Sequence, residues 1–214
     1  MGAVEIPRAT MERIVAECMA ETKAFPGNKE FVGYKVGAGV FDVLRLAGAD
    51  VPSSDQLTKL YWQTTGPIVW AGTQPLAVPD ELEAWFHEMT HAKQWWADML
   101  RMPIWYVQHA EMRGARYESE AFGQGLAIRI AVTGEIPVAK EAVRARYEHG
   151  YWMDQGSILV TTAILEGTLT SIAKGIIPPG IARSGIRKLY RENPGYLDAG
   201  MLDLIRKNNP EVLG

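Results

Sequence analysis

Apolar residues recur at intervals of three and four along most of this chain, which is the spacing that places them on one face of an α-helix. Proline and glycine separate these periodic segments, as at the turn that Pro26 and Gly27 predict. The longest segment begins at Pro79 and stops before Pro103. The pattern predicts helices over residues 7–23, 36–47, 55–62, 79–101, 110–131, 138–148, 181–190 and 197–207, and a buried helix or helix pair over 157–177.

Residues 68–70, Ile-Val-Trp, give the strongest strand signal, because β-branched and aromatic residues lie there between Gly66-Pro67 and Gly72. The sequence therefore predicts a mainly α fold with a small β-element before the long helix. It contains no internal repeat and no low-complexity tract. We expect a single domain over residues 1–214, with N-terminal helices and the short strand in 1–75, central helices in 79–131 and C-terminal helices in 136–214.

The composition indicates a globular protein, with 47% apolar residues, 22% charged residues and a net charge of −3. This charge provides no positive field that would attract nucleic acid or anionic lipid, so we expect neither as a partner. The apolar segment over 157–177 contains Glu166, Gly167 and Lys174, and is too polar and broken for a membrane span. A single cysteine, Cys18, and charged residues near the N-terminus favour a cytoplasmic protein without an export signal.

The long predicted helix contains the sequence His87-Glu88-Met89-Thr90-His91, which matches the pattern H-E-x-x-H. Residues four apart lie on nearly the same helix face, so His87 and His91 are able to converge on one tetrahedral ion. Glu88 lies about 100° further round the helix, where its carboxylate is able to take a proton from a zinc-bound water. The motif therefore predicts a zinc site with Glu88 as the general base.

An apolar stripe runs along the side of this helix opposite His87 and is predicted to pack against the core. His87 and His91 share the other side with Gln94 and Asp98. The periodicity leaves two alternatives for the histidines, which are exposure to solvent and a site completed by another element. The stripe consists of Leu82, Trp85, Met89, Ala92, Trp96 and Met99.

A third protein ligand has to come from another element, because Asp98 lies about 10 Å along the helix from His91. Glu118 and Glu120 are the candidates. Glu118 shares a helix face with small and apolar residues such as Phe122, whereas Glu120 lies among arginines. A carboxylate on an apolar face is costly unless a cation neutralises it, so we favour Glu118 over Glu120 as the third zinc ligand.

These residues resemble the gluzincin class of zinc metallopeptidases, over residues 80–131. The pattern H-E-x-x-H-x-x-Q at residues 87–94, followed by E-x-E-A at residues 118–121, is also similar to zincin-like domains of bacteria and phages. The resemblance implies a zincin-like fold, with His87, His91 and Glu118 as zinc ligands and Glu88 as the base. The predicted function is a zinc-dependent metallohydrolase, a peptidase in which the zinc-bound water attacks a peptide carbonyl.

The chain departs from many gluzincins at Phe122, where those proteins have an acidic residue that orients a ligand histidine. The loss of such a partner costs ~10- to 100-fold in metal affinity or activity. Asp98 or Glu111 is an alternative source of that contact. Phe122 also motivates an alternative function, a non-catalytic zincin-fold structural or binding protein such as a phage or bacterial assembly component. A phage origin would place it in the virion or the host cell.

Peptide hydrolysis also needs a hydrogen-bond donor for the developing oxyanion. His149 and Tyr151 flank Gly150 and are our first candidates for this catalytic role, ahead of His109 and Tyr117. The strand at residues 68–70 precedes the metal helix, where zincins carry an edge strand that pairs with extended substrate. An ordinary core strand is the alternative for this segment.

Overall fold

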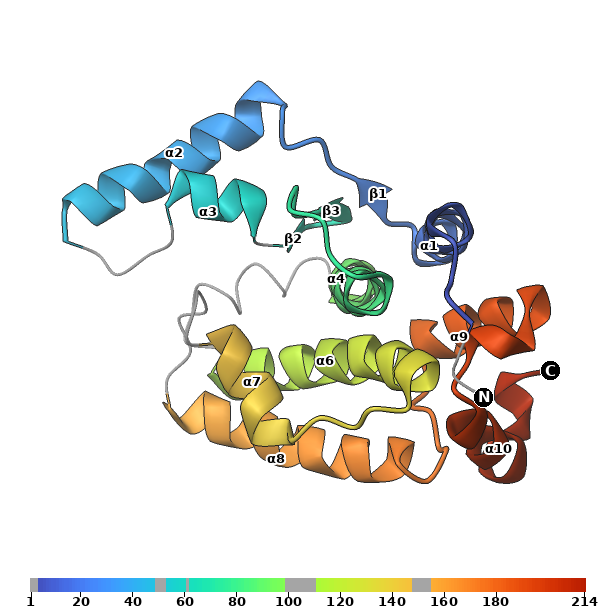
Figure 1. The fold of residues 1–214 in the computed structure, drawn as a ribbon. Coiled ribbons are helices and arrows are strands. Elements are labelled where there is room, and N and C mark those ends of the chain that lie inside the picture. The colour runs from blue at the N-terminus through green and yellow to red at the C-terminus, as the bar shows by residue number, and fades with distance from the viewer. Residues whose placement is uncertain (1–3, 49–52, 61, 99–110, 148–154) are drawn as a thin grey trace.

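Helix α4 (Val78–Asp98) carries both histidines and lies between two parts of the molecule (Figure 1). Below it in that view are α6 (Glu111–Thr133), α7 (Ala139–Tyr147) and α8 (Gln155–Ile172), and above it are the sheet and α3 (Ser54–Lys59). The computed structural model describes residues 4–48, 53–60, 62–98, 111–147 and 155–214. The remaining helices are α1 (Arg8–Thr22), α2 (Val32–Leu46), α9 (Ile181–Glu192) and α10 (Ala199–Asn208), with short 3-10 helices at Pro194–Tyr196 and Pro210–Val212.

The mainly helical fold and the small β-element are as predicted. Helix α8 is a single helix that ends at Ile172, and the chain then turns at Gly175, which has a positive φ of 76°. One face of α8 packs on α6, whereas Leu159 on another face is exposed. Among the helices of the described ranges, none has the length and apolar character needed to cross a membrane.

The sheet consists of β1 (Phe25–Pro26), β2 (Gln63–Thr65) and β3 (Ile68–Trp70) in the order β1-β3-β2. Strand β3 pairs in parallel with β1 and antiparallel with β2. The predicted strand at residues 68–70 is therefore the central strand of the sheet, and the edge position considered for it is wrong. Two partners already occupy both of its sides, so it cannot pair with a further strand.

The turn between β2 and β3 contains two residues, Gly66 and Pro67. Gly66 has a φ of +60°, which is the backbone conformation that favours glycine at the first central position of a tight hairpin turn. On the other side of β3, Gly27 closes against Trp70, because a Cβ atom at residue 27 would lie 2.4 Å from Cε3 of the indole ring. Gly66 thus allows the tight turn between β2 and β3, and Gly27 allows the close approach of the chain to Trp70.

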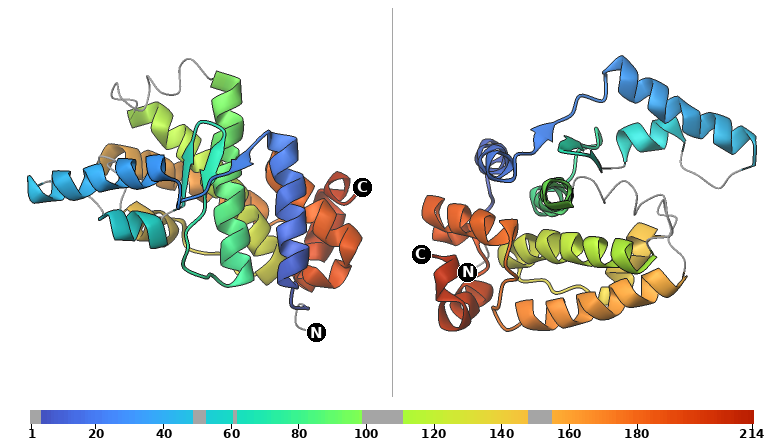
Figure 2. Two further views of the ribbon diagram at one scale, coloured as in Figure 1. Left: turned by 90° about the horizontal axis from the view of Figure 1, so that it is seen from above. Right: turned by 180° about the vertical axis from the view of Figure 1, so that it is seen from behind.

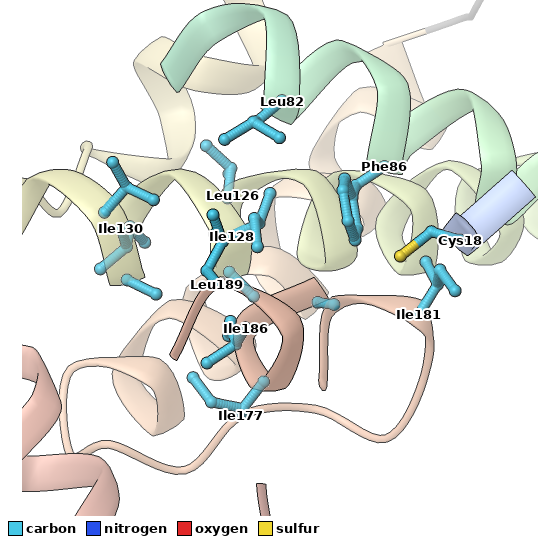
Figure 3. Close-up of a cluster of buried hydrophobic side chains, with 14 of the residues drawn as sticks. Cys18, Leu82, Phe86, Leu126, Ile128, Ile130, Ile177, Ile181, Ile186 and Leu189 are labelled. Atoms are coloured by element: carbon cyan, nitrogen blue, oxygen red, sulfur yellow. The ribbon is translucent and has the colours of Figure 1, made fainter. Parts of the chain in front are cut away.

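The hydrophobic core packs against α4 (Figure 3). Phe86 of α4 is fully buried there and meets α9, where a Cβ atom at Gly185 would lie 2.3 Å from Cζ of the Phe86 ring. In the left view of Figure 2, α1 runs beside α4 and completes this cover. The labelled core residues are Cys18, Leu82, Phe86, Leu126, Ile128, Ile130, Ile177, Ile181, Ile186 and Leu189.

The apolar stripe predicted on α4 is correct only in part. Leu82, Met89 and Ala92 are fully buried, but Trp96 is 44% exposed, and its indole nitrogen donates a hydrogen bond to the main-chain oxygen of Lys23. Met99 lies outside the described residues. Trp96 therefore packs at the rim of the molecule and does not belong to the core.

Candidate metal centre

Two adjacent helices bring together the three side chains that the sequence analysis selected as ligands. His87 and His91 lie one turn apart on α4, and Glu118 projects from α6, the helix packed most extensively against α4. The Nε2 atoms of the two histidines are 3.0 Å apart. Each of these nitrogens lies 3.5 Å from a carboxylate oxygen of Glu118. The three residues therefore form a compact triangle of donor atoms that could hold a metal ion.

The size of this triangle fits a tetrahedral zinc site. Zinc bonds to nitrogen and oxygen are about 2.0–2.2 Å long, so two ligand atoms of a tetrahedron lie about 3.3–3.6 Å apart. The observed separations of 3.0 and 3.5 Å fall close to that value. All three residues are at most 4% exposed, and His-His-Glu is a donor set that zinc accepts. The histidines thus face a site that α6 completes, which excludes the alternative of exposure to solvent.

Gln94 determines which ring atom of His91 faces the triangle. Its amide nitrogen donates to the main-chain oxygen of Tyr117 at 3.1 Å and to Oε2 of Glu120 at 3.0 Å. The amide oxygen is then left to accept from Nδ1 of His91 at 2.9 Å. In the neutral ring the proton therefore stays on Nδ1, and the lone pair of Nε2 faces His87 and Glu118.

The electrostatics of the triangle keep Glu118 ionised. Burial opposes the charge on Glu118, yet the two histidines hold the pKa of its carboxyl well below the usual range. Burial also opposes a charge on His91, but Glu118 outweighs it and raises the pKa of His91 to about 9. Burial lowers the pKa of His87 despite the same carboxylate. The site therefore carries one buried anion that requires a cation, either a protonated histidine or a metal.

Glu120 occupies a different position from Glu118. Its side chain is exposed, and it meets Gln94 and not the histidines. Glu118 is thus buried inside the triangle and Glu120 lies outside it, as their helix faces predict.

Phe122 stands where the expected acidic residue is missing. Its ring packs edge-on against His87, with ring centroids 4.8 Å apart and an interplanar angle of 70°. Nδ1 of His87 is buried without a hydrogen-bond partner in the part of the chain that the structure describes. Asp98 does not fill this role, because it accepts a hydrogen bond from the Tyr117 hydroxyl at 2.7 Å. The side chain of Glu111 is not among those that the structure describes.

Glu88 lies beside the triangle and is buried. Its carboxylate oxygen Oε2 accepts a hydrogen bond from the hydroxyl of Thr64 on β2 at 2.6 Å. Lys29 is also buried, and this burial lowers the pKa of its ammonium group to about 8. The negative charge of Glu88 acts in the opposite direction and partly offsets the shift. The ammonium group of Lys29 donates to the main-chain oxygens of Leu57 and Thr58 at the end of α3.

The predicted oxyanion donors lie mostly outside the described residues, which exclude His109, His149 and Tyr151. Tyr117, the remaining alternative, donates its hydroxyl proton to Asp98. Two residues of the site are not among those predicted from the sequence. Gln94 follows the second histidine by three residues, which is a signal that could have found it, and Thr64 lies at residues 63–65, where no strand is predicted.

Comparisons of the chain with protein-family models, curated proteins and solved structures found no match. The likeness to gluzincins therefore rests on the residue pattern and on the geometry of His87, His91 and Glu118.

Proposed function

We propose that the protein is a zinc-dependent metallohydrolase that cleaves peptide bonds, with a site of the gluzincin type. The observation that carries this proposal is the convergence of His87, His91 and Glu118 on one point, beside a separate buried carboxylate at Glu88. A purely structural zinc site has protein ligands at all four positions. In the described ranges three residues converge here, and three protein ligands with a separate carboxylate nearby are typical of hydrolytic sites.

In this proposal His87, His91 and Glu118 hold the metal. Zinc, when bound, supplies a Lewis acid that polarises a carbonyl group and lowers the pKa of a coordinated water. Glu88 accepts a proton from the attacking water and returns it to the nitrogen of the leaving amine. Thr64 donates a hydrogen bond to Oε2, which leaves both lone pairs of Oε1 for this transfer, so we assign the transfer to Oε1. His149 and Tyr151 remain our candidates for the oxyanion contact.

The position of the sheet supports a peptide as the substrate. Strand β2 pairs with β3 on one side only, and no other described strand covers its second side. Thr64 connects this strand to Glu88, so the free side of β2 is near the proposed base. An extended peptide that adds to such an edge gains main-chain hydrogen bonds. The other edge of the sheet is unsuitable, because Pro26 in β1 has no N–H to donate.

The proposal is tested by incubating the zinc-loaded protein with a proteome-derived peptide library and identifying cleaved peptides by mass spectrometry. The wild type is expected to cleave a defined set of sequences. Glu88→Gln is expected to keep its zinc and to lose at least 100-fold in turnover, as the loss of a general base requires. Glu166→Gln on the exposed face of α8 is the matched carboxylate control and should retain turnover. Equal turnover by Glu88→Gln would remove Glu88 from the mechanism.

Phe122 favours a second candidate function, a zinc-binding structural or assembly protein without hydrolytic activity. Its phenyl ring packs on His87 at the place of the acidic partner that many gluzincins have. The same assay separates the two functions. Stoichiometric zinc with no cleavage in the whole library would support the structural function, and cleavage lost only in Glu88→Gln would support the hydrolase.

A further inference from the structure

Thr64 holds the carboxylate of Glu88 from the opposite element of the site. Its Oγ1 atom lies 2.6 Å from Oε2 of Glu88 and 3.0 Å from the main-chain oxygen of the same residue. A hydroxyl has one proton, and the shorter contact has the length of a charge-assisted bond to a carboxylate. We propose that Thr64 is the positioning residue for Glu88, holding Oε2 so that Oε1 is the atom that exchanges the proton. This inference rests on the proposed function.

The register of the hairpin explains why Thr64, and not a neighbouring residue, reaches Glu88. Thr64 is paired directly with Val69, which is fully buried. Directly paired residues of antiparallel strands place their side chains on the same face of the sheet, so Thr64 faces α4 together with Val69. Gln63 and Thr65 face the other side because side chains alternate along a strand. A shift of one residue would remove the hydroxyl from Glu88.

The main chain of Thr64 faces the free side of β2. The main-chain oxygen of Val69 accepts a hydrogen bond from the N–H of Gly27 at 2.7 Å, so the main-chain groups of Val69 face β1 and not β2. Thr64 and Val69 are thus a non-hydrogen-bonded pair, and the N–H and C=O groups of Thr64 point away from β3. One residue therefore holds the base with its side chain and presents its main chain to an extended substrate. Substrate pairing and the orientation of Glu88 are coupled at this position.

The experiment compares Thr64→Val, which removes the hydroxyl at nearly constant shape, with Thr64→Ser, which keeps it. Thr65→Val is the matched control on the exposed face of the same strand. With a peptide taken from the library, Thr64→Val is expected to lower kcat by at least about 10-fold and to change KM little, as for a contact that acts on the base. Thr64→Ser should restore most of kcat, and Thr65→Val should resemble the wild type.

A crystal structure of each zinc-loaded variant provides a readout that does not depend on activity. Thr64→Val is expected to show the Glu88 carboxylate displaced from its position, with the zinc content and the hairpin unchanged, and Thr64→Ser to show it in place. An undisplaced carboxylate in Thr64→Val, or full kcat in that variant, would overturn the inference. If Glu88→Gln is inactive while Thr64→Val is fully active, only the role of Thr64 fails. If Glu88→Gln is fully active, the proposed function is wrong, and the role of Thr64 in positioning the base is wrong as well.

Discussion

The side-chain oxygen of Gln94 lies 2.9 Å from Nδ1 of His91, and the amide nitrogen of the same glutamine lies 3.0 Å from the carboxylate of Glu120. The amide thus connects a buried metal-ligand candidate to an exposed acid. A ligating histidine commonly donates its second ring N–H to a carboxylate, a carbonyl or a water. Here a neutral amide accepts that bond for His91, whereas His87 is oriented by the ring of Phe122.

Gln94→Ala is expected to weaken zinc binding by about 10- to 100-fold, because His91 loses the acceptor that fixes its orientation and tautomer. Competition with a chromogenic chelator measures the affinity. Glu120→Gln is the control, since it keeps the Gln94–His91 contact and an oxygen acceptor for the amide nitrogen. An unchanged affinity in Gln94→Ala would show that the glutamine only fills space.

Phe122→Ala is expected to lower the free energy of unfolding of the zinc-free protein by about 3–5 kcal/mol, the usual cost of a cavity left by a buried phenyl ring. Phe122 is 1% exposed, whereas Phe25 is 55% exposed. Phe25→Ala should therefore change stability by much less. Urea denaturation of both variants provides the comparison, and equal losses would contradict the packing described around His87.

Lys29 predicts a pH dependence of stability. Burial lowers its pKa to about 8 in the folded protein, against about 10.4 in an unfolded chain. Between these values the unfolded state binds more protons, so the contribution of Lys29 to the free energy of unfolding increases as the pH rises from about 8 to 10.4.

Urea denaturation at several pH values tests this prediction by comparing the wild type with Lys29→Met. The difference in unfolding free energy, wild type minus variant, should increase with pH across that window. Lys35→Met, at an exposed lysine, is the control for the loss of one positive charge. A difference that stays constant with pH would mean that Lys29 titrates normally.

The helical part of the fold could be predicted because its periodic segments are long. The metal helix was predicted over 79–101 and is described from Val78 to Asp98, and the burial of Glu118 followed from its small, apolar neighbours on α6. Such a pattern predicts which residues share a face of one helix, but not which other element packs against that face. It therefore left open whether the histidines face solvent or a second helix. Because α4 is covered on two sides, its histidines are buried as well as Leu82, Met89 and Ala92 of the apolar stripe.

The sheet and the contacts around the site could not be predicted in the same way. Strands β1 and β2 have two and three residues, too few for an alternating pattern to emerge. Thr64 acquires its contact with Glu88 only through its register with Val69, which is a tertiary relationship. Trp96 fits the helical period, but its side chain is 44% exposed and bonds the main chain of Lys23, just after the end of α1, which the period alone does not predict.

The zinc content per chain shows whether His87, His91 and Glu118 bind one metal ion. The protein is stripped of metal, equilibrated with limiting zinc, desalted and analysed by inductively coupled plasma mass spectrometry. We expect one zinc per chain in the wild type and in Glu120→Gln, and much less than one in His87→Ala and in Glu118→Gln. A wild type without stoichiometric zinc, or full zinc retention by His87→Ala, would mean that these three residues do not form a zinc site.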